Sequence, residues 1–174
     1  MEYIIIDIET NGMSALGNRV TAICCKTHYG GVEMSFTSQD EKSLLYNFWN
    51  WVDQINKSHN GVCFVGYNVY AFDLKFIHIR SMKYDLEVPV FSKDNYIDLR
   101  YELLYYEKFA KGSLGDYASF IGIAGKNGDG LKAIVLWDEC RISELVEYCM
   151  NDVTITHALF ERCIRAKIVK ELKK

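Results

Sequence analysis

The stretch IIIDIETNGM, residues 4–13, joins a run of isoleucines to two acids, Asp7 and Glu9, and ends in the turn signal Asn11-Gly12. An uninterrupted run of β-branched residues favours a buried strand. Side chains two apart on a strand point the same way, so Asp7 and Glu9 project together from one face. Two carboxylates this close repel each other unless a cation lies between them. The stretch therefore predicts either a cation site or, as the simpler alternative, a solvated strand end.

The composition is that of an ordinary globular chain. With 174 residues, 49% of them hydrophobic, the sequence is long enough for one core and too short for two comfortable domains, so we expect one domain over residues 1–174. No apolar run approaches the roughly 20 residues of a membrane span. The N-terminus lacks the pattern of a secretory signal. We expect a protein of the cytoplasm, or of the host cytoplasm if the source is viral, without a membrane partner.

Net charge and cysteine content further limit the class of protein that this sequence can belong to. The net charge of −3 argues against a protein that coats nucleic acid through clustered Lys and Arg, but it leaves room for an enzyme that grips a few nucleotides. The six cysteines form no C-x-x-C pair and lie in apolar or helical patterns, which predicts reduced core thiols. They are Cys24, Cys25, Cys63, Cys140, Cys149 and Cys163.

The first third of the chain predicts three antiparallel strands and a helix. Apolar runs and the Gly30-Gly31 break predict strands at 3–8, 19–29 and 32–37, the last two as a hairpin. Ser38 and Glu41 have the spacing of a capping box at a helix start. Apolar residues then keep a helical spacing down to the Asn60-Gly61 break, namely Leu44, Leu45, Phe48, Trp49, Val52 and Ile55.

The remainder predicts parallel strands with helices between them. A short apolar strand at 62–65 precedes a helix at about 71–82, and a strand, a crossover and a strand imply a parallel pair. Beyond these, we expect a strand at 96–99, helices at 101–109 and 113–121, a Gly-rich loop at 122–130 and a long helix from about 143. The predicted fold class is α/β with a mixed sheet and flanking helices.

Two further acids lie where a ligand site is expected. Asp73, in YNVYAFDLKFI, falls in the first turn of the helix after strand 62–65, at the edge where α/β sheets place ligands. Asn68 and Phe72 should face the same cleft. In ELVEYCMNDVTIT, Tyr148 and Asp152 are four residues apart and share one helical face beside an apolar stripe. Taken alone, Asp73 is explained more simply as an acid that the helix dipole favours in a first turn, and an ordinary surface pair explains Tyr148 and Asp152 equally well.

In this order, Asp7, Glu9, Asp73 and Asp152, with Tyr148 four residues before the last acid, resemble the three exonuclease motifs of the DEDD superfamily in its Tyr-bearing branch. The stretches KGSLGDYASFIGI and VLWDECRISELVEYCMND look like those of the exonuclease domains of family B DNA polymerases. The resemblance implies a ribonuclease H-like fold, with three antiparallel strands followed by parallel ones.

The resemblance also implies the chemistry. The four acids would hold two divalent ions, Mg²⁺ or Mn²⁺, that stabilise an in-line displacement at phosphorus. Asp7 would touch both ions, Glu9 and Asp152 the ion near the attacking water, and Asp73 the other ion, while Tyr148 would orient or help deprotonate the water. The sister branch uses a His five residues before the last acid, and Glu147 stands there in this chain.

Substrate contacts follow from the same resemblance. Thr10 and Met13 would grip and wedge the terminal nucleotide, with Asn68 and Phe72 on the opposite wall; core packing is the alternative for Met13 and Phe72. Two tyrosines could stack on bases and three loop lysines could meet phosphates. These are Tyr67, Tyr70, Lys111, Lys126 and Lys132.

The expected activity is removal of nucleotides from the 3′ ends of single-stranded DNA, in replication proofreading or repair, with a DNA polymerase or replication protein as a partner. An exoribonuclease of the same fold and a non-catalytic nucleic-acid or polymerase-binding module stay open as alternatives. A phosphate-binding loop of the G-x-x-x-x-G-K-[ST] type is absent, because Phe120 and Asn127 occupy two of its required positions in the Gly-rich loop.

Overall fold

The computed structural model describes residues 1–89, 93–104, 112–123 and 130–169. Five strands form one sheet in the order β3-β2-β1-β4-β5. β1 pairs antiparallel with β2 and parallel with β4, β2 pairs antiparallel with β3, and β4 pairs parallel with β5. The strands are β1 (Glu2–Thr10), β2 (Val20–Thr27), β3 (Glu33–Thr37), β4 (Val62–Gly66) and β5 (Tyr96–Asp98). The predicted mixed α/β sheet is therefore confirmed.

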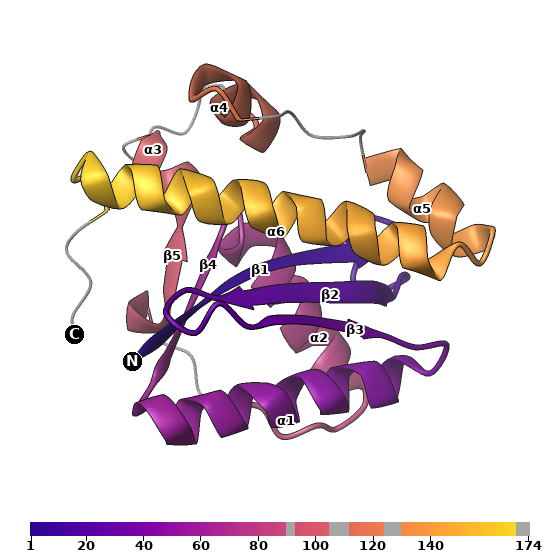
Figure 1. Ribbon diagram of the computed structural model, residues 1–174. Coiled ribbons are helices and arrows are strands. Elements are labelled where there is room, and N and C mark those ends of the chain that lie inside the picture. Colours follow the sequence, from indigo (N-terminus) through magenta and orange to yellow (C-terminus); the bar gives the residue numbers. More distant parts are fainter. Residues whose placement is uncertain (90–92, 105–111, 124–129, 170–174) are drawn as a thin grey trace.

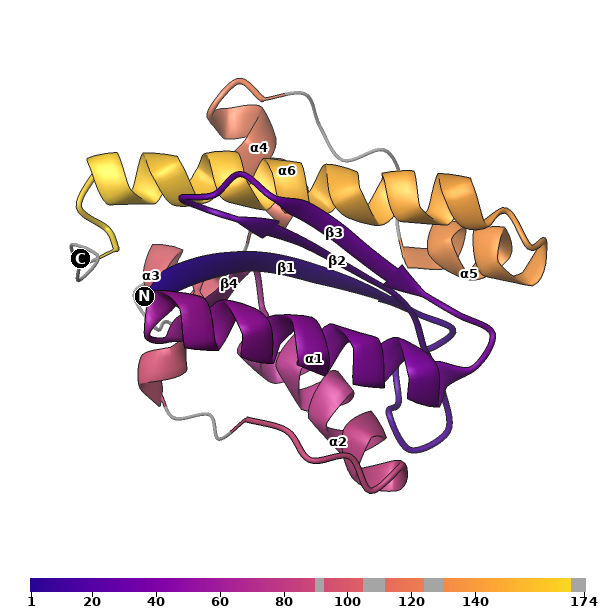
Figure 2. The same cartoon turned by 60° about the horizontal axis from the view of Figure 1, so that its bottom comes forward.

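Helices cover both faces of the sheet (Figures 1 and 2). α1 (Glu41–His59) and α2 (Lys75–Lys83) lie on one face, and the long α6 (Ile142–Arg165) crosses the other. Three shorter helices accompany them: α3 (Leu99–Leu103), α4 (Leu114–Phe120) and α5 (Gly130–Asp138). Alternate residues of β1 serve the two cores, since Ile4, Ile6 and Ile8 pack with α1 while Tyr3 and Ile5 pack with α6.

The helix boundaries differ from the predicted ones in three places. The predicted helix at 71–82 begins as a π-helical turn, η1 (Tyr70–Leu74), which passes into α2. The predicted helix at 101–109 is described only as α3, because residues 105–111 lie outside the described part. α5 was not predicted at all, although Ala133, Leu136 and Trp137 keep a helical spacing and are buried.

The capping box predicted for Ser38 and Glu41 is wrong. Asp40 is the residue that caps α1, because its side chain accepts hydrogen bonds from the N–H groups of Lys42 and Ser43. The Glu41 carboxylate turns inward instead. It accepts from the Val20 N–H at 2.8 Å and from the Arg80 Nε at 2.9 Å. A buried ion pair thus connects the start of α1 to β2 and α2.

The cysteines are free thiols, as predicted, but not all belong to the core. Cys24, Cys25, Cys63, Cys149 and Cys163 are buried, whereas Cys140 is exposed. Cys140 lies two residues after the end of α5, in the reversal between α5 and α6, and has a positive φ of 58°. Within the described ranges, no helix combines the length and the apolar character that crossing a bilayer requires.

Candidate active site

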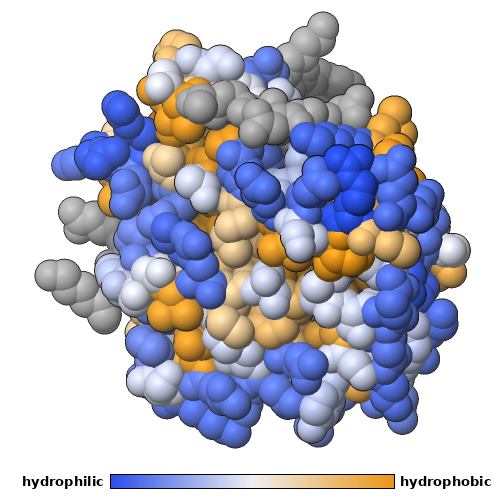
Figure 3. All heavy atoms as spheres, turned by 45° about the vertical axis from the view of Figure 1, so that its right-hand side comes forward, coloured by the Kyte–Doolittle hydropathy of each residue, from blue (hydrophilic) through white to orange (hydrophobic). Residues whose placement is uncertain are grey.

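A cavity of about 490 Å³ opens beside the end of β1, between the β4–η1 connection, α5 and α6. Figure 3 shows the side of the molecule where β1 ends and α6 begins, and hydrophobic side chains gather in the middle of that face within a hydrophilic surround. All nine site residues predicted from the sequence line this cavity: Asp7, Glu9, Thr10, Met13, Asn68, Phe72, Asp73, Tyr148 and Asp152. Residues separated by up to 145 positions are thus brought to one place.

β1 supplies two carboxylates to one wall of the cavity. Asp7 and Glu9 follow Tyr3 and Ile5 in the row of side chains that faces α6, so the strand's alternation places them together. The register between β1 and β2 shifts between Glu9 and Thr10, which is the irregularity typical of a bulge. Bulges re-aim side chains next to sites, and this one lies where β1 leaves the sheet.

The β4–η1 connection supplies Asp73 and Asn68. Asp73 is buried, and its Oδ1 accepts a hydrogen bond from the Ile8 N–H at 3.1 Å, which ties it directly to β1 between the other two acids. Asn68 has a left-handed φ of 65°. Its N–H donates to Asp98 Oδ1 at 2.8 Å, and the Tyr70 N–H donates to Asp98 Oδ2 at 3.0 Å. Asp98 therefore holds the turn from which the π-helical segment delivers Asp73.

α6 supplies Tyr148 and Asp152 from the opposite side. Asp152 is 1% exposed and Tyr148 is 4% exposed, so both side chains reach the cavity from a packed helix face. Cys149 lies between them in the sequence and points at β1. Its thiol donates to the Asp7 carbonyl oxygen at 3.4 Å and lies 3.6 Å from Asp7 Oδ2. The face that carries these side chains is fixed by Leu145 and Val153 in the core.

The apolar wall residues occupy different environments. Met13 is 81% exposed at the rim of the cavity, so core packing does not explain it. Phe72 lines the cavity and also packs against the core beneath α1 and α2. Thr10 is nearly buried, and its hydroxyl donates to the Gly12 carbonyl at 2.8 Å, which shapes the turn between the acids and Met13. Core packing thus applies to Phe72, and its contact with a nucleotide stays a prediction.

Of the residues suggested for bases and phosphates, only part can be placed. Tyr67 lines the cavity, and its hydroxyl donates to the Gly112 carbonyl. Tyr70 is absent from the described lining and stacks on Tyr96 at a ring separation of 4.8 Å. Lys132 is exposed, with Nζ 5.3 Å from the centre of the Tyr148 ring. Lys111 and Lys126 lie outside the described residues.

Residues 13–171 match a family model described as a predicted 3′-5′ exonuclease related to the exonuclease domain of PolB. The chain belongs to this family of predicted PolB-related exonucleases. The matched range contains Asp73, Tyr148 and Asp152 and begins after Asp7 and Glu9, so the first acidic pair rests on the sequence motif and the cavity.

Two further proteins are similar to this chain. An uncharacterized protein of Methanocaldococcus jannaschii is 30% identical over 98% of this chain and all of its own length. The family B DNA polymerase of the archaeon Pyrobaculum calidifontis superposes on 97% of this chain with a TM-score of 0.78 at 19% identity. This chain spans about a quarter of that polymerase. The fold is therefore the ribonuclease H-like α/β fold expected of a PolB-type exonuclease domain.

Several cavity residues were missed by the sequence interpretation. Leu131 and Ile134 come from α5, whose helical spacing was the signal that went unused. Ile8 and Gly12 line the cavity through their place beside predicted residues. Asp98 carried a sequence cue, an acid at the end of a predicted strand parallel to β4. For Cys149 there was no cue, because a thiol within an apolar stripe is typical of core packing.

Electrostatics at the cavity favour a cation. Burial, followed by the charge of Asp7, raises the pKa of Asp73 well above its ordinary value. Burial also raises the pKa of Cys149 well above its ordinary value, so the thiol stays protonated and acts as a hydrogen-bond donor to Asp7. Asp7, Glu9 and Cys149 present donor atoms within 4.8 Å of one another. The ligand set available at neutral pH is thus carboxylate oxygen, the set that Mg²⁺ and Mn²⁺ prefer.

The raised pKa of Asp73 predicts that this acid destabilises the metal-free fold. The folded chain holds the Asp73 proton more tightly than the unfolded chain, so the destabilisation is present above the folded pKa and is relieved as pH falls through it. In chelator at neutral pH, Asp73→Asn should raise the unfolding free energy by about 1 to 2 kcal/mol, because the amide oxygen can still accept from the Ile8 N–H. Thermal unfolding against pH checks this.

The difference between wild type and Asp73→Asn should close as pH approaches about 4, where an unfolded aspartate also becomes protonated. An Asp73→Asn variant that unfolds below the wild-type temperature in chelator at neutral pH would contradict this account of the charge at Asp73.

Asp98→Asn should loosen the turn that carries Asn68. An amide presents only one accepting oxygen, so one of the N–H groups of Asn68 and Tyr70 loses its acceptor. We expect a loss of about 1 to 3 kcal/mol in unfolding free energy, measured by urea titration. Asp138→Asn, at an exposed position at the end of α5, is the matched control and should change stability by less than about 0.5 kcal/mol. Equal effects of the two substitutions would exclude the role given to Asp98.

Proposed function

We propose that residues 1–174 act as one exonuclease domain that removes nucleotides from the 3′ end of single-stranded DNA by two-metal-ion phosphodiester hydrolysis. The observation that carries this proposal is the convergence of Asp7, Glu9, Asp73 and Asp152 with Tyr148 in a single cavity. Membership in a family of predicted PolB-related 3′-5′ exonucleases supports the polarity. Such an activity would serve DNA replication or repair, with a polymerase as a partner in proofreading.

The four acids are the residues that would hold the cations. Asp7, Glu9, Asp73 and Asp152 would supply the carboxylate oxygens that bind them. The donor set fits divalent cations because it is made of carboxylates on packed elements. Burial beside Asp7 disfavours the charged form of Asp73, and a bound cation would offset that cost. Bound Mg²⁺ or Mn²⁺ would supply a nucleophilic water at neutral pH and offset charge on the phosphate oxygens.

The protein's own part is to hold the terminal phosphodiester and to orient the water. Thr10 and Met13 would contact the terminal nucleotide from the β1 side, and Asn68 and Phe72 from the opposite wall. Met13 is exposed at the rim, where a flexible apolar side chain can slide against a base. Tyr67, also in the lining, would add an aromatic edge for the strand.

Tyr148 would orient the attacking water through its hydroxyl. Tyr148→Phe removes that hydroxyl and keeps the ring, which packs with Leu145 and Trp137 in the core around α5. We expect the rate of nucleotide removal under single-turnover conditions to fall about 10- to 1000-fold while binding of a 3′-ended oligonucleotide stays within about twofold. Unchanged single-turnover rates would exclude Tyr148 from the chemistry.

The deciding experiment is a gel time course on 5′-labelled single-stranded DNA and RNA of equal sequence, with Mg²⁺, with Mn²⁺ and with chelator. Asp152→Asn, purified in parallel, controls for a contaminating nuclease. The proposal predicts a ladder that shortens from the 3′ end on DNA, needs the metal and is lost in Asp152→Asn. A faster ladder on RNA would assign an exoribonuclease, and tight binding without any ladder would assign a binding module.

A further inference from the structure

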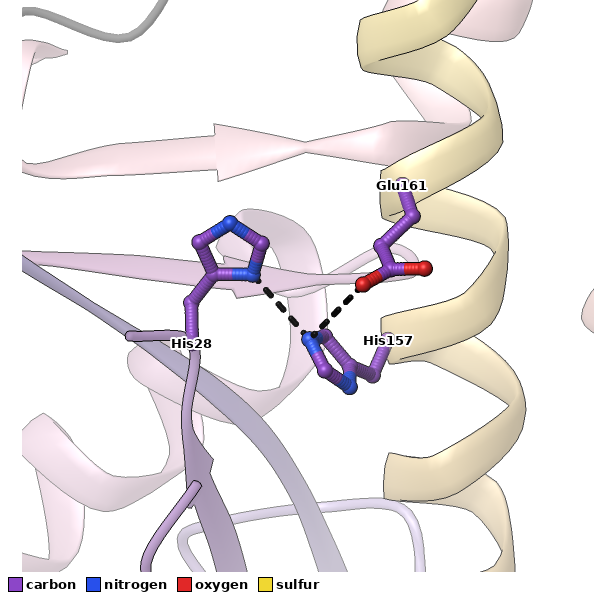
Figure 4. A group of neighbouring side chains, drawn as sticks. All are labelled: His28, His157 and Glu161. Atoms are coloured by element: carbon purple, nitrogen blue, oxygen red, sulfur yellow. Dashed lines mark hydrogen bonds and ion pairs between the residues drawn. The ribbon is translucent and has the colours of Figure 1, made fainter. Parts of the chain in front are cut away.

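A second group of potential metal ligands lies at the other end of the sheet. His28 follows β2, and His157 and Glu161 are four residues apart on α6, so they share one face of that helix. Figure 4 shows the three side chains converging on one point, His28 from the turn and the other two from the helix. Ligand atoms of all three lie within 4.8 Å of one another.

The distances in this group suit a cation. His28 Nδ1 and His157 Nε2 share a hydrogen bond of 3.0 Å, which a bound ion would replace, and His157 Nε2 is 3.9 Å from Glu161 Oε1. Two donor atoms bonded to a tetrahedral zinc ion at about 2.0 to 2.1 Å lie about 3.3 Å apart, between these two values. The 3.9 Å separation exceeds a direct hydrogen bond, so the carboxylate has room to turn toward an ion held by the two rings.

The surroundings keep the ligands available. Burial lowers the pKa of His157, which favours the neutral imidazole that a metal requires. The positive charge of Lys26 on β2 would repel a cation near His157, but Lys26 is paired with Glu33 at 2.9 Å. Arg165 lies 4.0 Å from the other oxygen of Glu161 and leaves Oε1 facing His157. The Glu161 side chain is 44% exposed, so an ion and a water ligand can enter from solvent.

This group is separate from the cavity that contains Asp7 and Asp152. The His28 N–H donates to the Tyr3 carbonyl, and Tyr3 precedes Asp7 by four residues of β1, or about 13 Å along the strand. Its ligands also differ in kind. Two imidazoles and one carboxylate suit zinc and its late first-row neighbours, whereas the ligands offered by the cavity are carboxylates, which suit Mg²⁺ and Mn²⁺.

We propose that His28, His157 and Glu161 bind one divalent ion of the zinc type, with water completing a four-coordinate shell. The ion connects the turn after β2 to α6 across 129 residues of sequence. It stabilises the packing of α6 on the sheet at the end away from the cavity. This site does not depend on the exonuclease proposal, since none of its ligands lines the cavity.

The first test is calorimetric titration of the metal-free protein, residues 1–174, with Zn²⁺. Wild type and Asp7→Asn should each bind one ion at this site, whereas His157→Gln should bind it at least about 100-fold more weakly and Glu161→Gln about 10-fold more weakly. His59→Gln, a histidine on α1 beside Glu2, is the matched control and should keep the wild-type affinity. Loss of binding in Asp7→Asn with retention in His157→Gln would assign the ion to the cavity and overturn the proposal.

Two further readouts do not depend on affinity. Co²⁺ should give the intense visible bands of a four-coordinate ion without a sulfur-to-metal charge-transfer band, which a site at the exposed Cys140 would produce. Zn²⁺ at about 100 times the wild-type dissociation constant should raise the unfolding temperature of wild type by about 5 to 10 °C and that of Glu161→Gln by about half as much at the same concentration. Equal thermal shifts in the two proteins would overturn the proposal, because Glu161 is half-exposed and its replacement should not disturb the fold.

Discussion

Asp7→Asn should lower the single-turnover rate of 3′ nucleotide removal at least about 1000-fold, the equivalent of some 4 kcal/mol of transition-state stabilisation. The amide keeps the size of the carboxylate and its place beside Cys149, but it removes the charge that would face both cations. Oligonucleotide binding should be retained or become tighter, because one negative charge near the phosphates is lost. Quenched-flow kinetics and a parallel binding titration measure the two effects separately.

Asp53→Asn is the matched control for Asp7→Asn. Asp53 is a partly exposed acid on α1 that pairs with Lys57, on the face of the sheet opposite α6. Its replacement should leave the single-turnover rate within about twofold of wild type. An Asp7→Asn protein that degrades DNA at the wild-type rate would refute the assignment of Asp7, whatever the behaviour of the other acids.

Arg80→Met should be the most destabilising of the substitutions considered, with a loss of about 3 to 5 kcal/mol in unfolding free energy. Its side chain is 5% exposed, and its guanidinium donates to both oxygens of Glu41 and to the Ala15 carbonyl. Methionine fills part of the volume but leaves Glu41 as a buried charge, whose remaining partners among the described residues are the Tyr84 hydroxyl and the Val20 N–H. Urea unfolding in chelator measures the loss.

Arg141→Met controls for the loss of a charged side chain as such. Arg141 pairs with Glu139 and Glu144, but all three side chains are about half-exposed, so water screens their attraction. We expect less than about 1 kcal/mol of change. The double variant Glu41→Gln/Arg80→Met should recover part of the stability lost in Arg80→Met, since no unpaired charge then remains in the core. A double variant less stable than Arg80→Met would contradict the proposed origin of the loss.

The sequence allowed the sheet and the acidic residues of the cavity to be predicted because both follow from short-range patterns. The isoleucine run in β1, the Gly30-Gly31 hairpin and the apolar strand 62–65 each carry their own period and turn signals. The D-x-E spacing placed Asp7 and Glu9 on one face, and the four-residue spacing did the same for Tyr148 and Asp152. Their convergence with Asp73 came from the ordered motif set.

What escaped prediction depends on contacts between distant segments. Ser38 and Glu41 have the spacing of a capping box, but the chance to pair with Arg80, 39 residues away, takes Glu41 out of the cap. The π-helical turn at Asp73 follows from Asp98 holding the Asn68 and Tyr70 N–H groups, a bond between two strand ends. The pairing of Glu41 with Arg80 leaves no local trace in the sequence, and the cue at Asp98 does not by itself identify the N–H groups that it accepts from.

The alternation of side chains between the two faces of β1 also protects the strand against misfolding. Ile4, Ile6 and Ile8 face the core of α1, and Tyr3, Ile5, Asp7 and Glu9 alternate with them on the face toward α6. A one-residue slip of β1 against its neighbours would exchange the two rows and drive both carboxylates among Leu44, Phe48 and their neighbours. Burying each unpaired charge there costs several kcal/mol. The acids proposed for catalysis would thus also act during folding as a check on strand register, and replacing both by Asn would weaken that check along with the activity.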